Sequence, residues 1–213
     1  MGPFHNAREY YATWAERYHE LICDRQLFTR YSVNAYLIFR YLNELAEQGQ
    51  WNAFEPGIDN GPFFLKHMDD KGDHILVNED FNVTGLIDWT FARAVPMYEA
   101  FGPSLLTAEM NDIYEGKPGR SWGDTILAEA IQTQNKDLVR FFGGPDLVRR
   151  FSFGLSMGMN MSWDEAVALF RGIMSTAERS SLKFDWEVWR QSSLCQWAGD
   201  AKLQELLLKL GEA

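Results

Sequence analysis

The sequence predicts an α+β fold that is mostly α-helical, and three observations lead to this prediction. Apolar residues recur at helical spacing in the first quarter of the chain, three short apolar runs of strand length occupy the middle, and helical periodicity returns after residue 101. Neither an internal repeat nor a low-complexity segment interrupts this order, so we expect a single domain over residues 1–213. It would consist of a helical pair (1–50), a small β unit (61–90) and a helical bundle (101–213).

Two amphipathic helices are expected at the start of the chain. Aromatic and aliphatic residues recur at spacings of three and four over residues 7–27, and residues 30–48 repeat the pattern. Glycine, proline, asparagine and aspartate are then concentrated in residues 55–62, so we expect a loop before the β unit.

The β unit is expected from the apolar runs 63–65, 75–77 and 83–87. Each run has the length of a strand, and residues 78–82 between the last two are typical of a hairpin connection. Polar residues follow the first and third runs. We therefore expect these polar residues to meet at one end of the hairpin.

Helices are expected again after residue 101, and three of them begin at residues that make good N-caps. The expected helices are 104–115, 122–134, 136–142, 145–157, 163–178, 185–198 and 201–210. Ser121, Ser162 and Asp185 stand where an N-cap side chain accepts a hydrogen bond from a first-turn N–H group. The tryptophans of the last helices are expected to pack in the core.

The charge balance disfavours some partners and indicates others. The chain has 20 Lys and Arg residues against 30 Asp and Glu residues, a net charge of -10, whereas nucleic-acid-binding surfaces are usually basic. An acidic balance suits a cationic small-molecule substrate. No apolar run approaches the roughly 18 residues of a membrane span, so neither a membrane nor nucleic acid is an expected partner. With no signal-peptide pattern and two distant cysteines, Cys23 and Cys195, we expect reduced thiols and a cytoplasmic location.

The most informative stretch of the sequence runs from residue 63 to residue 89. Asp69, Asp70 and Asp73 follow the first expected strand, and Asp88 follows the third. Phosphoryl transfer uses one carboxylate to orient a hydroxyl and accept its proton, while further oxygen ligands hold Mg²⁺ against the phosphates. Acidic residues that meet at one end of a hairpin could supply this arrangement.

Residues 67–77 read H-M-D-D-K-G-D-H-I-L-V and residues 87–89 read I-D-W. This pattern resembles the aminoglycoside phosphotransferase family, and most closely its fungal branch, in which the catalytic loop H-G-D-x-x-x-x-N-I-L-V precedes an I-D-W segment. The resemblance implies a protein-kinase-like C-terminal lobe. It implies that Asp69 is the catalytic base, that Asp88 binds metal, that His74 stands where the family has a metal-binding Asn, and that His67 is a structural loop residue.

Departures from the family pattern change what the resemblance implies. His74 replaces an Asn, and imidazole is a softer ligand than the oxygen donors that Mg²⁺ prefers. Met68 replaces a Gly in a tight loop. No Gly-rich strand pair with a following Lys precedes Asp69, so the N-terminal lobe that holds ATP in the family is expected to be absent. We therefore expect a degenerate or repurposed protein that acts on or binds a small molecule, with Mg²⁺ as the candidate cofactor. Half of the family's ATP site is missing from the sequence, and whether ATP binds stays open.

The candidate site residues follow from this interpretation. Asp69 and His74 are the catalytic candidates, Asp69, Asp73 and Asp88 are the metal-ligand candidates, Asp70 and Lys66 are the substrate-binding candidates, and His67 supports the loop. The surface that the N-terminal lobe would cover is a candidate homodimer interface.

Two alternative functions stay open. Residues 69–73 read D-D-x-x-D, the pattern with which class I terpene synthases bind Mg²⁺ and a diphosphate, so metal-dependent diphosphate chemistry is one alternative. Those enzymes carry the pattern on a helix, where positions i and i+4 share a face. Gly72 and the neighbouring strand-like runs argue against a helix here. The other alternative is a non-catalytic, pseudokinase-like binding module.

Overall fold

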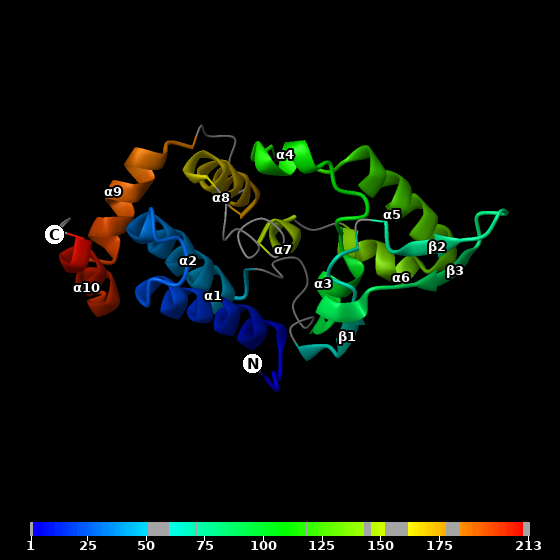
Figure 1. The fold of residues 1–213 in the computed structure, drawn as a ribbon, viewed down its shortest axis with the longest axis horizontal. Coiled ribbons are helices and arrows are strands. Elements are labelled where there is room, and N and C mark those ends of the chain that lie inside the picture. The colour runs from blue at the N-terminus through cyan, green and yellow to red at the C-terminus, as the bar shows by residue number, and fades with distance from the viewer. Residues whose placement is uncertain are drawn as a thin grey trace.

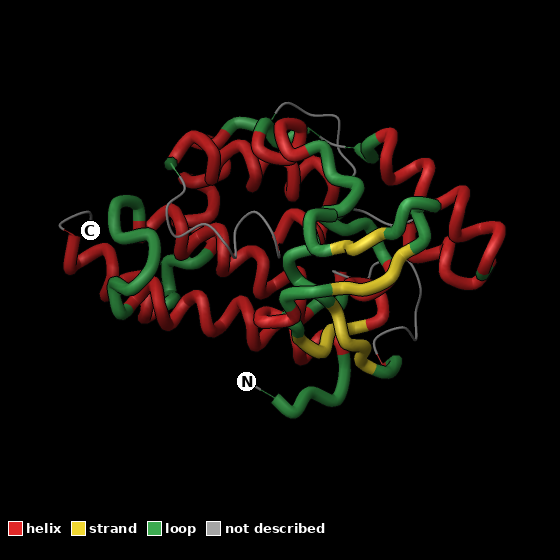
Figure 2. The backbone as a smooth tube through the Cα atoms, turned by 45° about the vertical axis from the view of Figure 1, so that its right-hand side comes forward, coloured by secondary structure: helices red, strands yellow, loops and turns green. Residues whose placement is uncertain are grey.

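The computed structural model of the chain describes residues 2–50, 60–70, 72–117, 119–142, 146–151, 162–177 and 184–210. These residues form a mostly helical α+β fold (Figure 1), as the sequence predicts. The described strands form two separate two-stranded antiparallel sheets. Figure 2 shows the strands gathered in one part of the molecule, with helices on either side of them.

The first two helices, α1 (Ala7–Cys23) and α2 (Ser32–Glu47), pack against each other and contribute much of the core. Tyr18 of α1 stacks on Phe39 of α2, with ring centroids 4.6 Å apart and an angle of 5° between the planes. Both rings are buried, so this contact joins the two helices in the interior.

The first helix ends at Cys23, earlier than the expected residue 27. Arg25 and Phe28 adopt positive φ values of 57° and 52°, which an α-helix excludes. The amphipathic pattern extends to residue 27 because the side chains of Leu27 and Phe28, which lie in the turn after α1, are also buried in the core. Periodicity therefore predicted burial correctly at these positions and the helix boundary wrongly.

The two sheets differ in the sequence separation between their paired strands. Strand β2 (Ile75–Val77) and strand β3 (Val83–Leu86) form the expected hairpin, with a register shift between Leu76 and Val77. Strand β1 (Phe63–Lys66) pairs with β4 (Arg93–Pro96), a strand that the sequence did not predict. Pro96 at the end of β4 cannot donate a ladder hydrogen bond, and the partner strand lies far away in sequence, so local periodicity does not reveal this pair.

The remaining elements complete a helical assembly around these strands. They are η3 (Trp89–Phe91), α3 (Met97–Phe101), α4 (Met110–Tyr114), α5 (Trp122–Gln134), α6 (Lys136–Val139), η4 (Arg140–Phe142), α7 (Leu147–Arg149), α8 (Trp163–Ala177), α9 (Trp186–Gln196) and α10 (Ala201–Leu210). The helix expected over 104–115 forms only as α4. Of the helix expected over 145–157, residues 147–149 form α7, whereas residues 145 and 152–157 lie outside the described residues.

The predicted N-caps are confirmed. The Ser121 hydroxyl accepts from the Asp124 N–H group at 2.8 Å, and Asp124 accepts in return from the Ser121 N–H group, which makes a capping box. Asp185 accepts from the Val188 N–H group at 3.1 Å. The Ser162 hydroxyl accepts from the Glu165 N–H group at 3.3 Å.

The predicted packing of the late tryptophans is also confirmed. Trp189 lies 4.6 Å from Phe170 and 5.1 Å from Trp186, measured between ring centroids. The two cysteines carry free thiols. Among the helices of the described residues, none combines the length and the apolar character needed to cross a membrane.

Candidate functional site

The hairpin brings one histidine and three carboxylates together. The His74 imidazole lies with Nδ1 3.8 Å from the Asp69 carboxylate and 3.7 Å from the Asp73 carboxylate, and with Nε2 3.7 Å from the Asp88 carboxylate. His74 Nδ1 is also 3.1 Å from the Asp69 backbone carbonyl oxygen. We call these four residues the His74 cluster. Its carboxylates come from the loop between β1 and β2 and from the end of β3, so both sheets are needed to assemble it.

His67 connects the two parts of the chain that form the His74 cluster. Its Nε2 atom lies 2.8 Å from the backbone carbonyl oxygen of Ile87, which directly precedes Asp88. The His67 ring also contacts the Trp89 ring, with centroids 5.1 Å apart. These contacts are the kind expected of a residue that supports the loop.

Asp88 adopts an unusual backbone conformation, with φ 56° and ψ 59° in the left-handed region. Such a conformation costs roughly 1–3 kcal/mol and persists only where the surroundings impose it, often at functional sites. The Asp88 carboxylate accepts a hydrogen bond from the Thr90 hydroxyl at 2.7 Å. This hydrogen bond lowers the pKa of Asp88, which keeps the carboxylate ionised.

The His74 cluster does not fit Mg²⁺ in this arrangement. Asp69 and Asp88 face different nitrogens of the imidazole, so the ring lies between the two carboxylates. Within the described residues, no group of three or more His, Cys, Asp or Glu side chains is placed to hold a metal ion. Mg²⁺ requires a near-octahedral set of oxygen ligands, and an imidazole between the carboxylates does not provide one.

The two substrate-binding candidates make contacts that hold the loop to the rest of the molecule. Lys66 Nζ donates to the backbone carbonyl of Glu99 at 2.7 Å, and burial lowers the pKa of the Lys66 ammonium. The Asp70 carboxylate accepts from the Leu105 N–H group at 3.2 Å. Lys66 and Asp70 therefore fix the two sides of the segment that carries Asp69.

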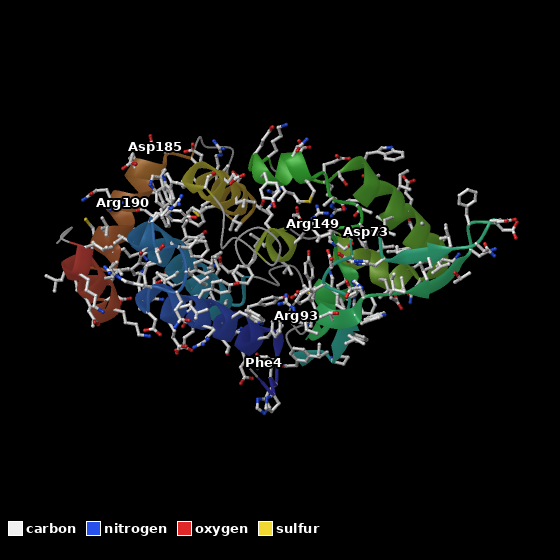
Figure 3. All side chains as sticks on the ribbon, viewed as in Figure 1. Phe4, Asp73, Arg93, Arg149, Asp185 and Arg190 are labelled. Atoms are coloured by element: carbon white, nitrogen blue, oxygen red, sulfur yellow. The ribbon has the colours of Figure 1, made fainter. Side chains whose placement is uncertain are left out.

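A buried carboxylate behind this loop was not found by sequence reasoning. Glu99 is 3% exposed, and its carboxylate accepts from Arg93 Nη2 at 2.8 Å and from the Tyr11 hydroxyl at 3.3 Å. Arg93, labelled in Figure 3, also lies over the Trp14 ring, 4.9 Å from the ring centroid. Contacts between residues so far apart in sequence leave no local pattern. The position of the acidic Glu99 among apolar residues was nevertheless a signal of a buried carboxylate.

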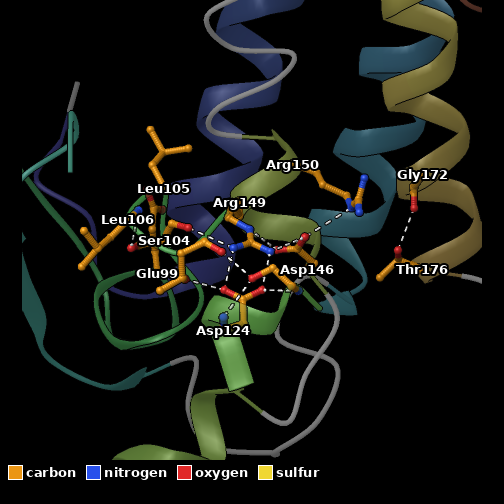
Figure 4. A network of polar contacts seen from close by, with 12 residues as sticks. Glu99, Ser104, Leu105, Leu106, Asp124, Asp146, Arg149, Arg150, Gly172 and Thr176 are labelled. Atoms are coloured by element: carbon orange, nitrogen blue, oxygen red, sulfur yellow. Dashed lines mark hydrogen bonds and ion pairs between the residues drawn. The ribbon is translucent and has the colours of Figure 1, made fainter. Parts of the chain in front are cut away.

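A second buried network, centred on Arg149, holds the segment that receives Asp70. Arg149 donates to both oxygens of Asp124 at 2.8 and 2.9 Å, and to Asp146 at 2.7 Å (Figure 4). It also donates to the Ser104 carbonyl at 2.9 Å, while Thr107 donates to Asp124 at 2.5 Å. The network therefore fixes the loop over residues 104–107, which explains why the expected helix does not begin at residue 104.

The D-D-x-x-D pattern does not lie on a helix. Residues 67–70 and 72–74 are non-helical, and Lys71 lies outside the described residues. Asp69 and Asp73 both face His74, whereas Asp70 accepts from Leu105. The shared helix face on which diphosphate-binding enzymes rely is therefore not formed by the described part of this segment.

Exposed apolar side chains lie on the β2–β3 hairpin and beside it, in β1 and η3. They are Leu65, Leu76, Val77, Phe81, Val83, Leu86, Ile87, Trp89 and Phe91. A two-stranded hairpin is marginal on its own. The homodimer prediction, which concerns the surface that an N-terminal lobe would cover, stays a prediction, and a measurement of the oligomeric state in solution tests it.

Comparison with known proteins identifies no family for this chain. No protein-family model, no curated protein and no solved structure matches the chain. The resemblance over residues 67–77 and 87–89 therefore depends on the sequence pattern, and the functional argument depends on the geometry of the His74 cluster.

Proposed function

We propose that the chain is a kinase-like lobe whose His74 cluster binds a small hydroxyl-bearing cation without a bound Mg²⁺ ion. One observation carries this proposal: the His74 imidazole lies between carboxylates at both of its ring nitrogens. In the phosphotransferase pattern that the sequence resembles, this position belongs to a metal-binding Asn. An imidazole at this position supplies no oxygen ligand, which supports a site that does not use Mg²⁺.

The exposure of the carboxylates supports a cationic ligand. The Asp88 and Asp73 side chains are 50% and 57% exposed, whereas the His74 side chain is 18% exposed. Carboxylate oxygens on the solvent side can therefore attract and pair with an ammonium group. The net charge of -10 favours the approach of a cation to this protein.

An exposed aromatic ring beside the cluster supports the same ligand class. Trp89 directly follows Asp88, is 42% exposed and is held by a hydrogen bond from its Nε1 to the Leu86 carbonyl at 3.0 Å. A tryptophan face attracts ammonium groups by a cation–π interaction of about 0.5–1 kcal/mol at exposed sites, and more when the cation is desolvated. Asp69, the candidate base, would accept a hydrogen bond from the hydroxyl group of the ligand.

Choline and its uncharged carbon analogue, dimethylbutanol, form a matched pair of probes for this proposal. Isothermal titration calorimetry should detect choline binding to the wild-type protein, unchanged by EDTA, and binding of dimethylbutanol should be at least about tenfold weaker. Asp88→Asn should weaken choline binding by about tenfold or more, because it removes one of the carboxylates that pair with the cation.

Glu16→Gln provides the control, because it removes one negative charge from an exposed position of α1 and should leave choline binding within about twofold of wild type. Equal binding of choline and dimethylbutanol would show that charge is not recognised. Choline binding that is lost on adding EDTA would contradict the metal-free site.

A further inference from the structure

A small cavity lies beside the buried network of Arg149. Its volume is about 30 Å³, and it is bounded by α4 with the residues that follow it, by the N-cap of α5, and by Arg149 and Arg150. A space of this size has room for about one or two water molecules, so a small ion fits and an organic ligand does not. The lining includes no residue of the His74 cluster.

The buried part of the cavity lining is basic. Arg149 is 6% exposed and Arg150 is 1% exposed, and both side chains line the cavity. The other charged residues of the lining are exposed, and they balance one another with two acidic and two basic side chains. They are Glu109, Asp112, Lys117 and Arg120.

The two neighbouring arginines differ in how completely they are paired. Arg149 makes short hydrogen bonds to both Asp124 and Asp146, whereas Arg150 Nε lies 3.4 Å from an Asp146 oxygen without forming a hydrogen bond. Arg150 Nη2 donates to the Lys117 carbonyl, but Nε and Nη1 have no hydrogen-bond partner among the residues that the structure describes. Since buried donors are normally satisfied, Arg150 requires a further acceptor.

The surroundings of Arg150 keep its charge away from water. Figure 4 shows the Arg150 guanidinium group turned toward Gly172 of α8. A Cβ atom at Gly172 would lie 2.6 Å from Arg150 Nη1, so glycine allows α8 to pack closely against this group. Burial lowers the pKa of Arg150, although the Asp146 carboxylate acts in the opposite direction. One shared carboxylate therefore does not fully balance the buried charge.

We infer that this cavity binds a single monatomic anion of the size of chloride. The anion would accept hydrogen bonds from the unpartnered N–H groups of Arg150, and charge-assisted hydrogen bonds of this kind are stronger than those to a neutral acceptor such as water. The volume of the cavity excludes larger anions. This inference is independent of the function proposed for the His74 cluster.

Urea denaturation of the wild-type protein in sodium chloride and in sodium gluconate, at equal ionic strength, tests this inference. Gluconate is too large for the cavity, so it serves as the reference anion. A ligand that binds only the folded state raises the folding equilibrium constant by a factor of 1 + [L]/Kd. We expect this constant to be about tenfold higher or more in chloride than in gluconate.

Variants of the arginines that line the cavity locate this effect. In Arg150→Gln the folding constants in the two salts should agree within about twofold, because the unpartnered guanidinium group is removed. Arg120→Gln should reduce the chloride effect by about threefold, and its exposed position keeps the test valid if Arg150→Gln does not fold.

Arg17→Gln is the matched control, since Arg17 is an exposed arginine of α1 that does not line the cavity. It should show the full chloride effect of the wild type. Equal folding constants of the wild type in chloride and gluconate would overturn the inference. So would a full chloride effect in Arg150→Gln or, if that variant does not fold, in Arg120→Gln.

Discussion

Two clusters of acidic and basic residues in this molecule use the same chemistry with opposite geometry. Around Arg149, the guanidinium group is 2.7–3.0 Å from the oxygens of Asp124 and Asp146, and all three side chains are buried. Around His74, the nitrogen–oxygen distances to the carboxylates are 3.7 and 3.8 Å, and two of these carboxylates are at least half exposed. The first arrangement is short and buried, whereas the second is longer and places Asp73 and Asp88 at the surface.

This difference distinguishes a supporting network, around Arg149, from a candidate binding cluster, around His74. The Arg149 network joins α5, α7 and the loop over residues 104–107, and that loop in turn holds Asp70. Asp70 neighbours Asp69 of the His74 cluster. A buried, fully paired network thus holds in place the loop that carries a loosely paired and exposed cluster.

The largest expected effect comes from breaking the buried network. Arg149→Met would leave Asp124 and Asp146 buried without their main cationic partner, so we expect the free energy of unfolding to fall by about 3–5 kcal/mol. Urea denaturation measures this change. Arg17→Met is the control, because the Arg17–Glu20 pair is half exposed and its loss should cost less than about 1 kcal/mol. A loss below about 1 kcal/mol for Arg149→Met would contradict the supporting role of the network.

A buried histidine offers the second comparison with His74. His19 is 5% exposed and stacks on Tyr36 at 4.7 Å, and its Nε2 atom has no hydrogen-bond partner among the residues that the structure describes. Burial, with a smaller contribution from Arg40, lowers the pKa of His19 from 6.5 to about 4. Between these pH values the unfolded chain binds more protons than the folded chain does. The contribution of neutral His19 to stability is therefore complete above about pH 6.5 and falls as the pH decreases toward 4.

The loss attributable to His19 should be on the order of 3 kcal/mol across this pH range. His19→Phe should remove this part of the pH dependence, which urea denaturation at several pH values measures against the wild type. His5→Gln should keep the wild-type slope, because the His5 side chain is 82% exposed. An equal slope in His19→Phe and wild type would show that His19 does not bury a neutral imidazole.

The smallest expected effect on stability comes from His74 itself. His74→Asn removes polar contacts that are long and largely exposed on the carboxylate side, so the free energy of unfolding should change by less than about 1 kcal/mol. The same urea titration measures it. A loss as large as that of Arg149→Met would show that the His74 cluster is a structural network as well.

Sequence reasoning succeeded where the determinants are local. The helices α5, α9 and α10 follow from periodicity and from caps such as Ser121 and Asp185, and the β2–β3 hairpin follows from two adjacent apolar runs. The pairing of β1 with β4 was missed because its partners are distant in the chain. The end of α1 was missed because positive φ values at turn residues leave no periodic signal.

In the candidate site too, local features were predicted and features that depend on long-range contacts were missed. The positions of short strands and the family resemblance together indicated Asp69, Asp73, His74 and Asp88 as a group. They could not predict that the imidazole would lie between the carboxylates, because that position depends on side-chain packing. The supporting residues Glu99, Asp124 and Arg149 were missed since each acts through contacts between distant segments.

The most direct test of the account is a choline titration of wild type and His74→Asn with and without Mg²⁺, at matched ionic strength. The imidazole lies between the carboxylates of Asp69 and Asp88, so we expect Mg²⁺ to leave choline binding to the wild type within about twofold. The smaller amide of His74→Asn provides an oxygen donor beside the same carboxylates, so Mg²⁺ should weaken choline binding to that variant by about tenfold or more. Equal competition by Mg²⁺ in the two proteins would contradict the claim that His74 separates this site from a metal site.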